Sequence, residues 1–119
     1  MDAVYIHIPF CRTICSYCDF CKVLYQDKWI LTYLDALSNE IGERYNHEEI
    51  KTLYIGGGTP SSLSLDSLTK LLEICQKLNL SKLEEFSFEC NLNDINTEML
   101  EVLKKYQVNR LSIGIESFN

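Results

Sequence analysis

The chain has 119 residues, 46% of them apolar, which is enough for one packed domain or for part of a larger one. Its formal net charge of −6 argues against nucleic acid and anionic membranes as partners, because both attract basic surfaces. No apolar run approaches the roughly 18 residues of a transmembrane helix, and the start MDAVYIHIPF lacks the basic region and cleavage site of a secretory signal. We therefore expect a cytoplasmic protein, where clustered cysteines usually indicate metal or redox chemistry.

The predicted elements alternate between strands and helices along the chain. Short apolar runs predict strands at residues 3–8, 51–55, 86–89 and 110–115. Apolar residues at every third or fourth position predict amphipathic helices at 27–45, 64–78 and 96–106. Ser64, and Asn96 or Thr97, are the expected N-caps of the last two helices, and Leu65 and Leu100 lie on their apolar stripes.

Strands that alternate with helices of this length predict an α/β protein with about four parallel strands and three crossover helices. The carboxyl ends of parallel strands are where such folds place their chemistry. Every unusual segment lies at or just after the end of a strand: the cysteines follow the first strand and Gly56-Gly57-Gly58 the second, while Glu89 ends the third and Glu116 follows the fourth. We therefore expect them to lie on one rim.

The cysteine loop is the strongest chemical signal in the sequence. Cys11, Cys15 and Cys18 form C-x3-C-x2-C, and Cys21 follows two positions later. Thiolates favour iron–sulfur clusters, zinc or copper(I), and no second cysteine pair or His-x3-His follows downstream. One loop with several thiolates favours an iron–sulfur cluster, with a zinc-binding module or reduced core cysteines as the alternatives. The spacing alone does not choose between three ligands and four.

Three motifs in order carry a resemblance that runs over nearly the whole chain: YIHIPFC with CSYCDF, then YIGGGTPS, then RLSIGIESFN. Together they resemble the radical S-adenosylmethionine (SAM) superfamily, and within it the oxygen-independent coproporphyrinogen III oxidase-like proteins. Phe20 stands where the coproporphyrinogen dehydrogenases of that branch carry a further cysteine, so the chain looks most like the relatives regarded as heme chaperones. The alternatives are a dehydrogenase-type radical enzyme and a non-catalytic, cluster-binding half-barrel.

The resemblance implies that Cys11, Cys15 and Cys18 bind three irons of a 4Fe–4S cluster, whose fourth iron takes the amino and carboxylate groups of SAM. An electron donor would then be a partner, and heme or a porphyrin the expected ligand or substrate. In oxidase-type members, one electron cleaves the sulfonium and releases a 5′-deoxyadenosyl radical. Cys21 is interpreted as a neighbouring thiol, with a fourth ligand that closes the cluster as the alternative.

The resemblance also implies the residues that contact SAM, which are Tyr5, Tyr17, Gly57, Gly58, Thr59, Glu89 and Glu116. Tyr17 would pack near the adenine, the glycine loop would bind the amino group, and Glu89 would bind the ribose. Glu116 stands where many relatives have glutamine, which argues against a second SAM because a carboxylate cannot donate. The structural alternatives are a barrel-core aromatic for Tyr5, a simple turn for the glycines and a solvated carboxylate for Glu89. No catalytic residue is assigned.

The family fold is a partial (β/α)6 TIM-like barrel, and four strands cannot close a barrel. We therefore expect residues 1–119 to form the N-terminal, incomplete part of a radical SAM core domain, with the first and fourth strands as edges. The segments that would hold heme or a porphyrin in relatives are absent from this length of chain, so we expect this chain alone to be inactive.

Overall fold

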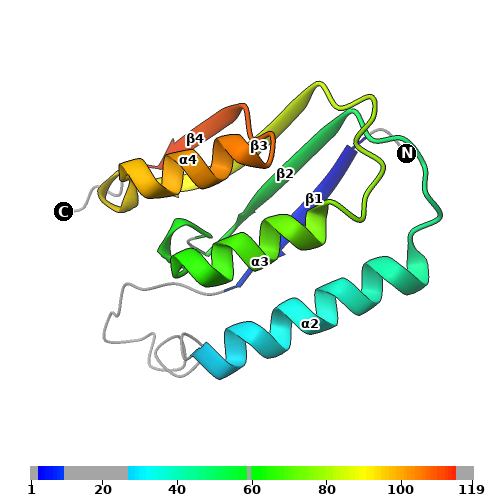
Figure 1. Ribbon diagram of the computed structural model, residues 1–119, viewed down its shortest axis with the longest axis horizontal. Helices are drawn as coiled ribbons and strands as arrows, with labels where there is room; N and C mark the ends of the chain where they lie inside the picture. The colour runs from blue at the N-terminus through cyan, green and yellow to red at the C-terminus, as the bar shows by residue number, and fades with distance from the viewer. Residues whose placement is uncertain (1–2, 10–26, 59, 115–119) are drawn as a thin grey trace.

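The structure is a computed structural model that describes residues 3–9, 27–58 and 60–114. In these residues, four parallel strands lie in the order β1-β2-β3-β4, so β1 and β4 are the edges of the sheet (Figure 1). The strands are β1 (Ala3–Ile8), β2 (Thr52–Gly57), β3 (Glu85–Asn91) and β4 (Arg110–Gly114). The predicted parallel α/β sheet with helical crossovers is confirmed.

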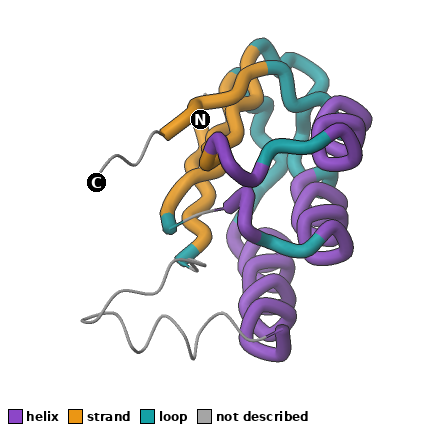
Figure 2. The backbone as a smooth tube through the Cα atoms, turned by 90° about the vertical axis from the view of Figure 1, so that its left-hand side faces the viewer, coloured by secondary structure: helices purple, strands orange, loops and turns teal. Residues whose placement is uncertain are grey.

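The helices connect these strands and lie on one side of the sheet (Figure 2). They are α2 (Asp27–Arg44), α3 (Leu65–Cys75) and α4 (Thr97–Lys105), with short 3-10 turns η1 (Pro60–Ser62) and η2 (Leu92–Asp94). The Ser64 hydroxyl accepts a hydrogen bond from the backbone N–H of Ser67, and the Asn96 side chain accepts one from Met99. Both predicted N-caps are therefore confirmed.

The core lies between the sheet and the helices. Successive side chains of a strand point to opposite faces of a sheet, and on β3 the residues that face the helices are Phe86, Phe88 and Cys90, all buried. Ile6 and Ile8 of β1 are buried in the same layer. The apolar faces of α3 and α4 close the core through residues that include Leu68, Leu71, Leu72, Cys75, Met99 and Leu103.

Two sequence predictions about the core are wrong. Leu65 and Leu100, placed on the inner helix stripes by their spacing, are 41% and 39% exposed. Leu65 is the first residue of α3 and lines a surface pocket rather than the core. Leu100 lines a groove together with Leu111 of β4, the last strand of the described sheet, so no further element covers it among the described residues.

The glycine run also changes one boundary. The sequence predicted that the second strand ends before Gly56, but β2 includes Gly56 and Gly57, which pair with His7 and Ile8 of β1. The glycines therefore continue the parallel ladder instead of ending it.

Among the described residues, none of the helices combines the length and the apolar character that a bilayer crossing requires.

The buried thiol of Cys75 predicts a pH dependence of stability. Burial raises the pKa of this thiol to about 12, whereas an unfolded cysteine ionises near pH 8.5. Above about pH 8.5 the unfolded chain loses a proton that the folded chain keeps, so the free energy of unfolding falls as the pH rises toward 12. The Cys75→Ala variant lacks this titrating thiol. We therefore expect urea unfolding to show a smaller loss of stability between about pH 8 and pH 10.5 in the variant than in the wild type. Equal losses in variant and wild type would contradict this assignment.

Candidate functional site

Four predicted site residues lie in the described part of the chain, and the structure brings them together on β1, β2 and β3 and just after β2. Tyr5 belongs to β1, Gly57 and Gly58 lie at the end of β2, and Glu89 belongs to β3. The remaining predicted residues lie outside the described residues; these are Cys11, Cys15, Cys18, Cys21, Tyr17, Thr59 and Glu116. Their roles stay predictions.

The helices leave one face of the sheet uncovered (Figure 2), and strand alternation places the side chains of the site on that face. On β1, Ile6 and Ile8 point into the core, whereas Tyr5 is 55% exposed on the opposite face. Tyr5 pairs in register with Tyr54 of β2, which pairs with Ser87 of β3. Alternation then puts Glu89, two residues after Ser87, on the same face. The open face is therefore polar where the helix face is apolar.

The carboxylate of Glu89 is held by two donors from β2. Its Oε2 accepts a hydrogen bond from the Tyr54 hydroxyl at 2.9 Å, and its Oε1 accepts one from the backbone N–H of Gly57 at 3.0 Å. The side chain is half-buried, and a charge taken partly out of water needs such partners. The interpretation of Glu89 as a merely solvated carboxylate does not describe this geometry.

The glycines allow backbone and side chains to approach at distances that a β-carbon would prevent. A Cβ at Gly56 would lie 2.7 Å from Tyr54 Cε1, 2.9 Å from Glu89 Oε1 and 3.0 Å from the Tyr5 hydroxyl. Gly57 has a φ of +119°, a conformation that other residues rarely adopt, and a Cβ there would lie 2.5 Å from the Ile8 carbonyl oxygen. The run is thus required by close contacts among β1, β2 and β3.

The two amides of this loop are used within the protein. Gly57 donates to Glu89, and Gly58 donates to the Ile8 carbonyl oxygen at 2.7 Å. Neither of these N–H groups is therefore left to bind a ligand.

Tyr5 stacks on Tyr54, with ring centroids 5.7 Å apart and an interplanar angle of 21°. Its hydroxyl lies 3.3 Å from His7 Nδ1. Partial desolvation, followed by the nearby Glu89 carboxylate and Tyr54, raises the pKa of the Tyr5 hydroxyl above its ordinary value. Tyr5 is therefore a neutral phenol at pH 7 on the open face, outside the core between the sheet and the helices. The backbone carbonyl of His7 accepts a hydrogen bond from Tyr33, which links β1 to α2.

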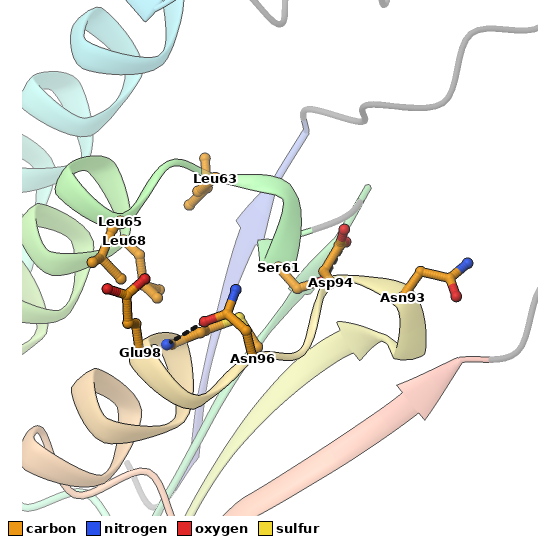
Figure 3. Close-up of a pocket in the computed structure, with 9 residues that line it drawn as sticks. Ser61, Leu63, Leu65, Leu68, Asn93, Asp94, Asn96 and Glu98 are labelled. Carbon is orange, nitrogen blue, oxygen red and sulfur yellow. Dashed lines mark hydrogen bonds between the residues drawn. The ribbon is translucent and has the colours of Figure 1, made fainter.

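Three residues of this arrangement are not among the predicted site residues: Tyr54, Gly56 and Ser61. The buried Ser61 hydroxyl accepts a hydrogen bond from Asn91 N at 2.8 Å and donates to Asp94 Oδ2 at 2.9 Å, which ties η1 to the end of β3. Figure 3 shows Ser61 and Asp94 beside a pocket of about 210 Å³ between the starts of α3 and α4. Strand alternation could have placed Tyr54 and Gly56 on the face of Tyr5, but no local signal marks Ser61.

Metal binding in the described part of the chain has no candidate centre. Among these residues, no three histidine, cysteine or carboxylate side chains are placed to hold one ion. Cys75 of α3 and Cys90 of β3 are buried in the core between the sheet and the helices, with pKa values raised by burial to about 12 and about 11. Thiols held in this protonated state are poor metal ligands, so the predicted ligands remain those of the cysteine loop.

A side chain at position 56 tests the close packing at the end of β2. We expect Gly56→Ala to lower the free energy of unfolding by about 1–3 kcal/mol, because the added methyl group collides with Tyr54, Glu89 and Tyr5. The matched control is Gly42→Ala in α2, where a Cβ meets nothing within 4 Å and the helix should gain about 0.5–1 kcal/mol. Urea unfolding of both variants measures the difference, and equal effects would show that position 56 is not crowded.

Comparison with known proteins identifies the family. Residues 5–119 match the profile of the Radical SAM superfamily. The heme chaperone HemW of Lactococcus lactis is 45% identical over 119 residues, which cover 99% of this chain and 31% of that protein. The heme chaperone HemW of Bacillus subtilis is 43% identical over 123 residues, which cover 99% of this chain and 32% of that protein. The chain spans about a third of the length of these relatives.

A solved structure shows the same fold. The structure of coproporphyrinogen III oxidase (HemN) from Escherichia coli, a radical SAM enzyme, matches with a TM-score of 0.76 at 30% identity, over 99% of this chain and 28% of that one. The four parallel strands and the helices between them correspond to the start of its TIM-like barrel, as the sequence predicted. With a profile match over residues 5–119 and a fold shared at 30% identity, the chain belongs to the radical SAM superfamily.

Proposed function

We propose that the chain binds a 4Fe–4S cluster and SAM, and that it serves heme or porphyrin metabolism in the cytoplasm as a heme-chaperone type of protein. Cys11, Cys15 and Cys18 are the proposed cluster ligands. The proposed SAM contacts are Tyr5, Tyr17, Gly57, Gly58, Thr59, Glu89 and Glu116.

The position of the Glu89 carboxylate carries this proposal. It lies half-buried on the open face of the sheet, with one hydrogen bond to each oxygen. An ionised carboxylate offers about four acceptor positions, so acceptor capacity remains beyond the bonds from Tyr54 and Gly57. A pair of sugar hydroxyls, such as those of a ribose, is complementary to it.

The surrounding residues fit the other parts of SAM. The carbonyl oxygens at Gly57 and Gly58 suit its ammonium group, because the two N–H groups of these residues are used elsewhere. Tyr5 offers an exposed ring face and a neutral hydroxyl beside them. When bound together, a cluster and SAM supply one-electron chemistry at a sulfonium. The residues described here bind and orient the nucleoside and help to exclude water from it.

The heme-chaperone role is supported by the relatives. Identity to two heme chaperones, at 45% and 43%, exceeds the 30% identity to the HemN oxidase. Phe20, in place of a further cysteine, favours the same branch. The alternative is a coproporphyrinogen-oxidising radical enzyme, which the structural match to HemN favours.

Anaerobic reconstitution with iron and sulfide tests the cluster. We expect a brown protein whose electron paramagnetic resonance signal, after reduction, changes when SAM is added. Cys15→Ala should abolish the colour because it removes a ligand, whereas the matched variant Cys21→Ala should keep most of it. A cluster that does not respond to SAM would contradict the SAM site, and equal loss in both variants would contradict the ligand assignment.

Heme titration then separates the two roles. Binding of heme to the reconstituted chain, followed in the visible absorbance, supports the chaperone role. Conversion of coproporphyrinogen III without stable heme binding supports the oxidising enzyme and argues against the chaperone role.

A further inference from the structure

Tyr54 occupies the centre of the open face, although no part of the proposed site includes it. It lies on β2, between Tyr5 of β1 and Glu89 of β3. Its ring stacks on that of Tyr5 at a centroid distance of 5.7 Å, and its hydroxyl donates to Glu89 Oε2 at 2.9 Å. One side chain therefore contacts proposed ligand-binding residues from both neighbouring strands.

The sheet register explains how it reaches both. Tyr54 pairs directly with Tyr5 on one side and with Ser87 on the other. Glu89 lies two residues beyond Ser87, at the diagonal position that long aromatic side chains can reach across a sheet. Ser87 has a small side chain that hydrogen-bonds to Glu85 Oε2, so it does not block the path from the Tyr54 hydroxyl to Glu89.

Two donors fix a carboxylate where one would not. With Gly57 N–H alone, Glu89 keeps freedom to rotate about its terminal bonds, which are broad in their angular preference. The Tyr54 hydroxyl bonds the other oxygen, so the two bonds together set the plane of the carboxylate. The acceptor positions that remain then point in fixed directions on the open face.

We propose that Tyr54 is a positioning residue, which holds the Glu89 carboxylate in the orientation that receives the hydroxyl groups of a bound nucleoside. The identity of that nucleoside as SAM rests on the proposed function. Tyr54 acts through Glu89 and through stacking on Tyr5, and it needs no contact of its own with the ligand.

The position of Gly56 is consistent with this role. Its missing side chain leaves room in which Tyr54, Glu89 and Tyr5 meet, since a Cβ there would lie within 3.0 Å of all three. Residue 56 is the neighbour of Tyr54 two positions along the same face. The contact that Tyr54 makes with Glu89 therefore lies in a closely packed part of the open face.

The test removes only the hydroxyl. Tyr54→Phe keeps the ring that stacks on Tyr5, and its matched control is Tyr106→Phe, which removes a tyrosine hydroxyl bonded to Glu73 Oε2 between α4 and α3. Equilibrium dialysis with SAM is carried out on the reconstituted full chain. We expect about tenfold weaker binding in Tyr54→Phe, the effect of one hydrogen bond to a charged group, and unchanged binding in Tyr106→Phe.

A double-mutant cycle with Glu89→Gln shows whether Tyr54 acts through Glu89. We expect the double variant to bind SAM no more weakly than Glu89→Gln alone. Additive losses would overturn the proposal, because Tyr54 would then act independently. Unchanged SAM affinity in Tyr54→Phe would overturn it while the proposed function stands.

The same cycle without ligand separates the two inferences. We expect urea unfolding to show coupling between positions 54 and 89, with about a tenfold effect on the unfolding equilibrium. Absence of this coupling would overturn the positioning role whatever the SAM result. The wild-type chain could show this coupling and yet bind no SAM. That result would contradict both the proposed function and SAM as the ligand of this site. The coupling would then report only the packing of the sheet.

Discussion

The carboxylate of Glu89 ties the end of β3 to the end of β2. It belongs to β3, but both donors to its oxygens belong to β2. Because a half-buried carboxylate is costly without such partners, the orientation of Glu89 and the path of the glycine run depend on each other. Gly58 extends the same constraint to β1 through its bond to Ile8. The open rim of the sheet is therefore one connected unit, and not three independent loops.

This unit is separated from the core by the alternation of the strands. On β3, Phe88 is fully buried against the helices, and the next residue, Glu89, lies on the open face. Most of the stabilising burial comes from the helix side, where Leu71, Leu72 and Phe86 pack. The polar residues of the open face can therefore be arranged for binding without replacing the apolar residues that hold the fold together.

Local patterns were sufficient for the order of elements and for the caps, because each depends on residues close in sequence. The Ser64 cap needs only the N–H of Ser67. The exposure of Leu65 and Leu100 could not be predicted from spacing. Leu65 begins α3 beside a surface pocket, and Leu100 lies next to the edge strand β4, where no further described element covers it. The continuation of β2 through Gly56 and Gly57 was missed for a similar reason: a glycine run usually indicates a turn, and only pairing with β1 shows that the ladder goes on.

The sequence could predict only that the site residues lie near the ends of neighbouring strands, and not which of their side chains contact one another. The bond from Tyr54 to Glu89 joins residues 35 positions apart, and it requires the register of two strand pairs. Parallel α/β sheets serve many unrelated functions, so topology alone does not select this one. The distinguishing feature is a position without a side chain, Gly56, against which Tyr5, Tyr54 and Glu89 converge. At position 56 the sheet requires only a backbone that can pair with β1, and most residues meet that requirement. The three converging side chains also require that the position has no side chain, and glycine alone meets this second requirement.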